Sequence, residues 1–204
     1  MIVLDSIKQI VLCFCASFIL SSCSTKKSKS EIEVIFSRDT LAIGYTYWWS
    51  QTAPFNGNCE DSHSLVFTGT IKDIAAVNDT SGPLYESQEG IIEIERLYKI
   101  KDIGANIYAE QKFIRTDCFF ESNLKEGDTV LVFCYDYEDA YTIPGKECIV
   151  KIKGFDDALI KSVRKYIDAN DDLTALRKDT EVWDAVGLGT AVENGLVACK
   201  EDAK

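Results

Sequence analysis

The chain has little of what metal sites and nucleic-acid-binding surfaces require. It contains one histidine, His63, and no pair of cysteines separated by two residues, so it lacks the clustered ligands of a zinc site. Its 22 lysines and arginines stand against 33 aspartates and glutamates, a formal net charge of -11. Phosphate backbones are bound through Lys and Arg, so this balance disfavours nucleic acid as a partner. There is no glycine-rich phosphate loop either, and we expect neither a metal nor a cofactor.

A long hydrophobic run is also missing. Residues 10–20 (IVLCFCASFIL) carry no charge, but a membrane-spanning helix needs about 20 apolar residues. The run has the length of the apolar core of a secretory signal peptide, although the charge of Lys8 before it is partly cancelled by Asp5. We therefore expect residues 1–22 to be a signal peptide that is removed on export.

The end of this segment indicates a membrane anchor. Leu20-Ser21-Ser22-Cys23 resembles the lipobox of bacterial lipoproteins, in which small residues precede the cut and the cysteine sulfur receives a diacylglycerol. The resemblance implies that Cys23 is lipidated and that its freed amine is then acylated with a fatty acid such as palmitate. Firm anchoring needs more than one acyl chain, and a cysteine modified at both its sulfur and its amine would carry two or three. The alternative is an ordinary signal peptide followed by a chance cysteine.

A short polar stretch follows the expected anchor. Residues 23–30 continue from Cys23 as STKKSKS, which is basic, has no apolar position and predicts a flexible linker. In enterobacterial lipoproteins an Asp after the lipidated cysteine marks retention in the inner membrane, and here the residue is Ser24. We therefore expect a lipid-anchored protein of the bacterial cell envelope, at the outer membrane rather than the inner one where the host has both.

Strand patterns dominate residues 31–153. Apolar and polar residues alternate with the period of half-buried strands, and Gly69 marks a bulge or bend inside one of them. The stretch 129–137 has almost no polar residue before Asp136, which indicates a central strand. The expected strands are 32–36, 65–77, 90–100, 106–114, 129–137 and 148–153.

One amphipathic helix follows the strands. Asp156 is a suitable N-cap, and we expect the helix to dock on the sheet as a structural element and to break at residues 170–172. A short second helix to Lys178 would follow, and we leave the tail 179–204 unassigned. The apolar stripe at helical spacing consists of Leu159, Ile160, Val163 and Ile167.

Together these elements predict a mostly β fold in one domain, residues 31–178. Roughly 180 of the 204 residues remain after export, which is enough for a single core. Five to seven strands joined by hairpin-scale turns indicate a small closed or partly closed barrel with the C-terminal amphipathic helix packed on it. A β-sandwich fits the strand pattern nearly as well.

Five short words recur in a recognisable order. They are SLVFTGTI (64–71), IIEIERLYK (91–99), YAEQKFIRTDC (108–118), LKEGDTVLVF (124–133) and KECIV (146–150). Their order resembles the netrin-like, or tissue-inhibitor-of-metalloproteinase-like, OB-fold module over roughly residues 59–168. The resemblance implies an OB-like barrel. It does not carry over the zinc-chelating N-terminal cysteine of the animal inhibitors, because Cys23 is expected to be acylated and Cys59 is internal.

The exported part has an odd number of cysteines after Cys23. At least one therefore stays unpaired within the chain, although export permits disulfides. The netrin-like resemblance implies a disulfide from Cys59 to Cys118 or Cys148. Cys134, inside an apolar strand, is expected to be a buried thiol or the partner of Cys199.

An aromatic segment, YTYWWSQTAPFNGNC (45–59), is the clearest candidate for a binding surface. Aromatic side chains give large contact areas at low entropic cost and are enriched in binding hot spots. The alternative is that they belong to the core, where large aromatics are often found. The candidate binding residues are Tyr45, Tyr47, Trp48, Trp49 and Phe55.

No catalytic set emerges from the sequence. EDSHS (60–64) places Ser62, His63 and Ser64 side by side, but a catalytic triad needs side chains that converge in space, and a turn explains the segment. We therefore expect a lipid-anchored, non-enzymatic envelope protein whose barrel binds another protein, as an inhibitor or an accessory subunit. The alternatives are a glycan-binding lipoprotein that uses the aromatic segment and a hydrolase that uses His63.

Overall fold

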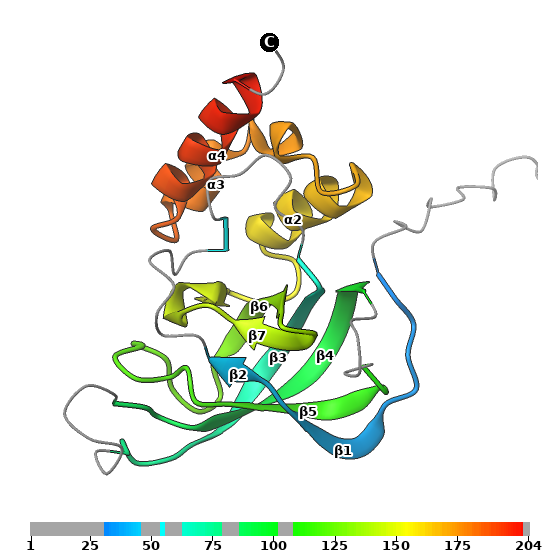
Figure 1. Cartoon of the computed structure of the whole chain (residues 1–204), viewed down its shortest axis with the longest axis vertical. Helices are drawn as coiled ribbons and strands as arrows, with labels where there is room; N and C mark the ends of the chain where they lie inside the picture. Colours follow the sequence, from blue (N-terminus) through cyan, green and yellow to red (C-terminus); the bar gives the residue numbers. More distant parts are fainter. Residues whose placement is uncertain (1–30, 46–53, 56–62, 79–85, 102–107, 202–204) are drawn as a thin grey trace, which may run out of the picture.

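The computed structural model describes residues 31–45, 54–55, 63–78, 86–101 and 108–201. They form a mostly β fold in which a mixed, curved sheet makes a half-barrel and the C-terminal helices gather at one end of it (Figure 1). The strands are β1 (Ser37–Ala42), β2 (Gly44–Tyr45), β3 (Leu65–Ile74), β4 (Gly90–Ile100), β5 (Gln111–Thr116), β6 (Thr129–Tyr137), β7 (Ala140–Ile143) and β8 (Ile149–Lys151). The helical elements are η1 (Lys146–Cys148), α2 (Ala158–Asp168), η2 (Leu173–Leu176), α3 (Thr180–Asp184) and α4 (Gly189–Glu201).

The described strands form one sheet in the order β1-β5-β4-β3-β6-β7-β2, with β8 also paired to β6. β1 and β2 pair in parallel with β5 and β7, and the other pairs are antiparallel. β1 and β2 lie at opposite ends of this order, yet only Ile43 separates them in the chain. The sheet must therefore curl until its two ends approach each other. The described strands are thus not the two stacked sheets of a sandwich.

The centre of the sheet confirms the sequence pattern. β4 spans the expected residues. β6 pairs with β3 on one side and with β7 and β8 on the other, and it is buried from Val130 to Tyr135. The β3–β4 register shifts between Thr68 and Gly69, which confirms the expected bulge. A Cβ atom at Gly69 would lie 2.3 Å from the Glu93 carbonyl oxygen, so this close approach requires glycine.

The first expected strand, 32–36, differs from the observed first strand, β1. Residues 32–36 contribute only an isolated bridge from Ile32 to Leu97, and β1 starts at Ser37. Apart from this bridge, residues 32–36 have no partner strand among the described residues, and the side chain of Ile35 is 90% exposed. The expected strand 106–114 is β5, at Gln111–Thr116.

Two short strands, β2 and β7, are not among the expected strands. β7 follows a two-residue hairpin turn in which Glu138 and Asp139 both have positive φ (51° and 58°). Such turns normally contain Asn-Gly or Asp-Gly, so the sequence gives little warning of this hairpin.

The helix α2 occupies the predicted place, with a corrected cap. Its N-cap is Asp157, not Asp156: the Asp157 carboxylate accepts a hydrogen bond from the Leu159 N–H (3.0 Å). The helix ends before Asn170 and Asp171, which both have positive φ, and this confirms the predicted break. The short element that follows is the 3-10 helix η2.

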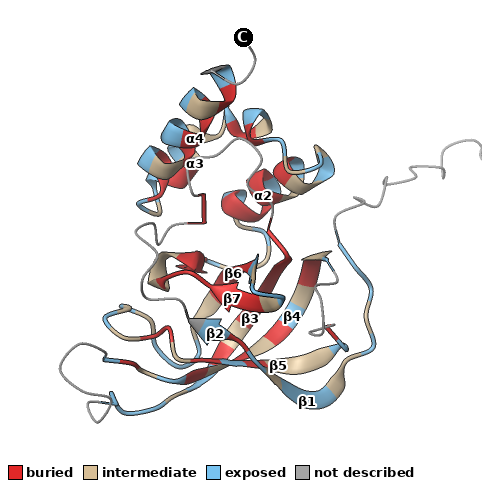
Figure 2. Cartoon of the chain, viewed as in Figure 1, coloured by how far each residue is buried: buried red, intermediate tan, exposed pale blue. Residues whose placement is uncertain are grey.

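The unassigned tail belongs to the fold. It forms α3 and α4, which both carry buried residues (Figure 2). Trp183 of α3 is fully buried in the same core as the sheet residues. The turn that follows α3 contains a glycine in the left-handed region, Gly187 (φ 78°), and after it the Leu188 N–H donates to the Trp183 carbonyl (2.9 Å). This is the backbone pattern by which a glycine closes a helix C-terminus.

Candidate functional site

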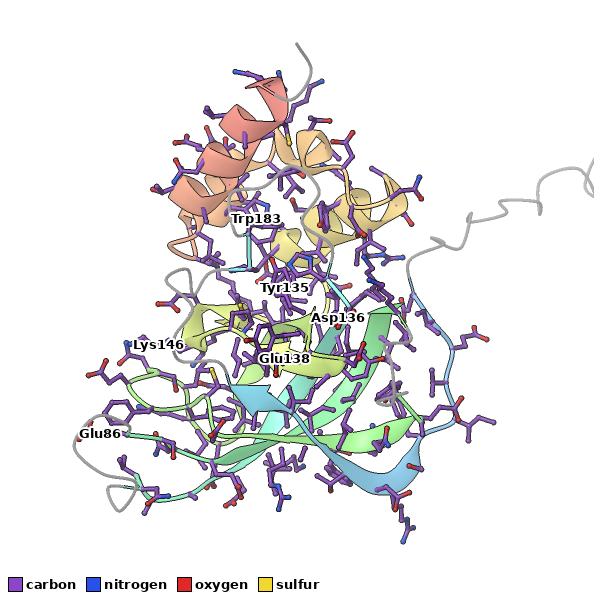
Figure 3. The ribbon with its side chains drawn as sticks, viewed as in Figure 1. Glu86, Tyr135, Asp136, Glu138, Lys146 and Trp183 are labelled. Carbon is purple, nitrogen blue, oxygen red and sulfur yellow. The ribbon has the colours of Figure 1, made fainter. Side chains whose placement is uncertain are left out.

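The sheet and the helices meet at a sealed cluster of rings, which we call the aromatic junction. Phe55 lies at its centre, with its ring centroid 5.0 Å from that of Trp183 and 5.6 Å from those of His63 and Tyr166. Figure 3 shows Trp183 and Tyr135 where the helices meet the strands. The aromatic junction consists of Phe55, His63, Phe133, Tyr135, Tyr166 and Trp183.

Polar atoms inside the aromatic junction are mostly paired. The Trp183 indole N–H donates to Ser162 Oγ (2.9 Å). The carbonyl of Pro54 accepts from the Tyr135 hydroxyl and lies 2.5 Å from His63 Nε2. His63 Nδ1 has no hydrogen-bond partner within the part of the chain that the structure describes. Burial lowers the pKa of His63 to about 3 despite the opposing hydrogen bond to Pro54, so the ring is neutral at pH 7.

The arrangement does not bring His63 and Ser64 together as base and nucleophile. Both residues are completely buried, and the Ser64 hydroxyl donates to the Cys134 carbonyl (3.1 Å). A general base must reach the hydroxyl proton that it removes. Ser62 lies outside the described residues.

The aromatic binding candidates do not form a described surface. Phe55 is 3% exposed and belongs to the aromatic junction, so its assignment as a binding residue was wrong and the core alternative holds. The backbone of Tyr45 lies in β2, opposite Ile143 of β7. Tyr47, Trp48 and Trp49 lie outside the described residues.

A second stretch of the boundary between sheet and helices is open. It is a groove of about 1030 Å³ between the η1–β8 segment and α3. Its apolar surface combines buried residues with the half-exposed valines Val182 and Val186 and the exposed Ala185. We call this feature the apolar groove; its apolar lining residues are Leu124, Ile149, Val150, Ile152, Ala158, Val182, Ala185, Val186 and Leu188.

Two lysines that line the apolar groove form ion pairs. Lys146 Nζ lies 3.2 Å from the Glu121 carboxylate, and Lys151 Nζ lies 2.6 Å from that of Asp128. The hydrogen bond from Lys151 lowers the pKa of Asp128, so this carboxyl stays ionised. Exposed pairs of this kind contribute little to stability.

The backbone at this edge is also largely satisfied. Ile152 donates its N–H to Thr129 of β6, so by alternation the N–H groups of Ile149, Lys151 and Lys153 point away from β6. Two of these outward groups are used locally: Ile149 donates to the Lys146 carbonyl, and Lys153 donates to the Asp157 carboxylate (2.9 Å). A strand added here would find few free donors. The groove therefore offers apolar side-chain contact rather than a backbone template.

Sequence reasoning missed the α3 side of the groove because Val182, Ala185, Val186 and Leu188 lie in the unassigned tail. Val182 and Val186 are spaced as one helical face, and Gly187 signals the end of α3. These signals predict a short helix. They do not reveal that the valines stay half-exposed, because that depends on how far α3 stands from β8.

The described cysteines differ from the expected disulfide. Cys118, Cys134 and Cys148 are buried and form no disulfide, whereas Cys199 is disulfide-bonded. The expected bond from Cys59 to Cys118 or Cys148 is therefore wrong for both described partners; Cys59 itself, like the lipidation site Cys23, lies outside the described residues. Cys134 is confirmed as a buried thiol.

Comparisons with known proteins do not assign the chain. No known protein family matches it, and no curated protein matches it significantly. None of the described helices is long and apolar enough to span a membrane.

Proposed function

We propose that this protein is a lipid-anchored, non-enzymatic component of the bacterial cell envelope, whose OB-like, netrin-like barrel binds another protein. The lipobox ending at Cys23 supports the anchor and the address. The curled mixed sheet, with its two ends joined through Ile43, supports the OB-like barrel. The apolar groove carries the binding proposal.

The composition of the groove indicates the kind of partner. Two of its lysines are ion-paired, Lys146 with Glu121 and Lys151 with Asp128, and the outward N–H groups of Ile149 and Lys153 are used locally. Its free capacity lies in aliphatic side chains, of which Val182 and Val186 are half-exposed. Removing such surface from water contributes about 25 cal/mol per Å². The partner should therefore present a protruding cluster of apolar side chains.

His63 and Ser64, the catalytic candidates within the described residues, do not form a base–nucleophile pair. His63 is neutral and sealed among rings, and the Ser64 hydroxyl is committed to a backbone carbonyl. Phe55 is in the core, and the other aromatic residues proposed for glycan binding lie outside the described part of the chain, so no described residue favours glycan binding.

Site-specific photo-crosslinking tests the proposal. A benzophenone amino acid at Ala185, which is exposed in the groove, should give a discrete adduct with one envelope protein in intact cells. The matched control carries the same label at Val197, which is 54% exposed on α4 and does not line the groove. Adducts of equal yield at both positions, or none at Ala185, would refute a binding role for the groove.

A further inference from the structure

The first described residues are held on one side of the fold. The Glu31 carboxylate lies 3.9 Å from Arg96 Nε of β4 and 4.0 Å from a guanidinium nitrogen of Arg164 in α2. The Ile32 N–H donates to the Leu97 carbonyl (2.8 Å). The chain therefore enters the fold where β4 and α2 meet, as Figure 1 shows.

This entry point carries an excess of cations. The Arg96 guanidinium lies over the ring of Phe155, 4.8 Å from the ring centroid, in the segment that leads into α2. The side chains of Glu31, Arg96 and Arg164 stay partly exposed. One carboxylate thus faces two guanidinium groups at the surface.

The outward side of α2 extends the same charge. Lys161 is exposed, and Lys165 Nζ lies 2.7 Å from the Asp179 carboxylate. In a chain with a net charge of -11, the charged residues of this helix are Lys161, Arg164, Lys165 and Asp168. We call this surface the entry face; it consists of Glu31, Arg96, Lys161, Arg164 and Lys165.

The length of chain before Glu31 limits how the fold can stand on a membrane. Cys23, the expected site of lipid attachment, is eight residues earlier, and this stretch spans at most about 29 Å when fully extended. Its average end-to-end distance as a flexible linker is about 16 Å. A domain of this size has a radius of gyration of about 15 Å, so it is about 40 Å across.

The linker is therefore too short for the far side of the fold to face the bilayer. Figure 3 places Glu86 and Lys146 on the other side of the molecule from the start of β1. If that side were turned to the lipid, Glu31 would stand about 40 Å above it. An extended linker of about 29 Å cannot reach so far.

We propose that the entry face is the lipid-facing side of this protein, where Arg96, Lys161 and Arg164 lie against the phosphates of anionic lipids in the membrane that holds the anchor. Anionic headgroups attract Lys and Arg near the surface and repel the acidic remainder of the chain. The inference rests on the proposed lipid anchor, and it does not depend on what the apolar groove binds.

Fluorescence quenching tests this orientation. The full-length lipidated protein carries a fluorescent amino acid either at Asp168 of α2 or at Glu86, two exposed carboxylates on different sides of the fold. The vesicles contain phosphatidylglycerol and phosphatidylcholine, with a nitroxide on some headgroups. We expect quenching at least about twofold stronger at position 168, because a short tether keeps only this label near the lipid. Equal quenching at the two positions, or stronger quenching at position 86, would overturn the proposal.

Two charge variants separate lipid contact from the constraint of the tether. Lys161→Glu should weaken the quenching at position 168 in anionic vesicles but not in vesicles of phosphatidylcholine alone. Lys125→Glu makes the same charge change at an exposed residue outside the entry face and is the matched control. If the two variants behave alike in anionic vesicles, the cations of the entry face do not contact the lipid.

Flotation of the same vesicles separates this inference from the anchor on which it rests. The parent protein should float with the vesicles, whereas Cys23→Ala, which removes the attachment site, should stay in the soluble fraction. A parent that does not float would refute the anchor and this inference with it. A parent that floats but shows equal quenching at positions 168 and 86 would refute the orientation alone.

Discussion

The sheet and the C-terminal helices meet along two stretches that differ in how they are filled. The aromatic junction is sealed: Phe55 and Trp183 interlock, and the indole N–H and the Tyr135 hydroxyl are hydrogen-bonded. The apolar groove, between α3 and β8, leaves aliphatic side chains half-exposed. Trp183 and Val182 are consecutive residues of α3, so one short helix holds the fold together on one face and offers a surface on the other.

This contrast separates stability from recognition. Residues of the sealed stretch have lost their contact with water and contribute mainly to folding, as buried aromatics do. Residues of the open stretch contribute less to folding and remain available to a partner. Substitutions on the two faces of α3 should therefore have opposite profiles, with large stability losses at the aromatic junction and large binding losses at the apolar groove.

The largest effect is expected from Trp183→Ala. It removes a completely buried ring that contacts Phe55 and Phe133, and leaves a cavity where the sheet meets the helices. Deletions of this kind cost about 3 to 5 kcal/mol. Urea denaturation of the purified protein measures the loss. Val197→Ala, at an exposed site on α4, is the control and should stay within about 0.5 kcal/mol of the parent. A loss below about 1 kcal/mol for Trp183→Ala would mean that the junction is not packed as described.

The second effect is a loss of stability in mild acid caused by His63. Its pKa is about 3 in the folded state, against an ordinary value of 6.5, because it is buried; Lys99 lowers the value further. Below pH 6.5 His63 therefore binds a proton in the unfolded chain but not in the folded chain. The free energy of unfolding falls as the pH decreases towards 3. The slope is about 1.4 kcal/mol per pH unit, or roughly 2 to 3 kcal/mol between pH 6.5 and 4.5.

Urea titrations at a series of pH values give this slope. His63→Phe keeps a ring in the junction and removes the titrating group, so its stability should be nearly flat over the same interval, whatever its absolute value. If the variant and the parent lose stability in parallel, the acid sensitivity comes from other groups and the assignment to His63 fails.

A smaller effect is expected at the start of α2. Asp157→Ala removes the carboxylate that accepts from the N–H groups of Leu159 and Lys153. Burial alone would raise the pKa of Asp157, but these backbone donors bring it below its ordinary value, so the cap is ionised at neutral pH. The expected cost is about 1 kcal/mol. Asp156→Ala is the matched control and should change the free energy of unfolding by less than about 0.5 kcal/mol; a reversed order of the two losses would restore Asp156 as the cap.

The sequence predicted the elements that build the two stretches better than the contacts between them. Strong patterns gave β4 and β6, and the stripe containing Leu159 and Val163 gave α2 with its buried face. These predictions hold because burial imposes a period on the chain. The mismatch between Asp156 and Asp157 is a shift of one residue in a segment where both neighbours can cap.

The rest depended on contacts between distant segments. No local pattern places Phe55 beside Trp183, because residues far apart in the chain meet only after the sheet has curled. The same holds for Cys118, which lines a small cavity with Lys146 and Glu147 although it lies far from them in the chain. The groove is harder still, since its existence depends on a gap between elements rather than on a property of any residue.

The smallest effect on stability should accompany a large effect on binding. Ala185→Lys places a charge in the apolar groove at an exposed position, directly after the last residue of α3. A cation near a helix C-terminus is tolerated or mildly favourable, so the free energy of unfolding should change by no more than about 0.5 kcal/mol. A desolvated charge facing apolar side chains of a partner is costly, so binding should weaken at least about tenfold.

Capture of the partner identified by crosslinking, measured beside urea denaturation, gives both readouts on one protein. Val197→Lys adds the same charge to an exposed valine outside the groove, so it controls for the change in net charge of this acidic chain. If Ala185→Lys and Val197→Lys bind equally well, the partner does not use the groove, and the contrast between the two faces of α3 concerns packing alone. If Ala185→Lys instead unfolds the protein, α3 is held on its groove side as well. That result would remove the division between a sealed and an open stretch.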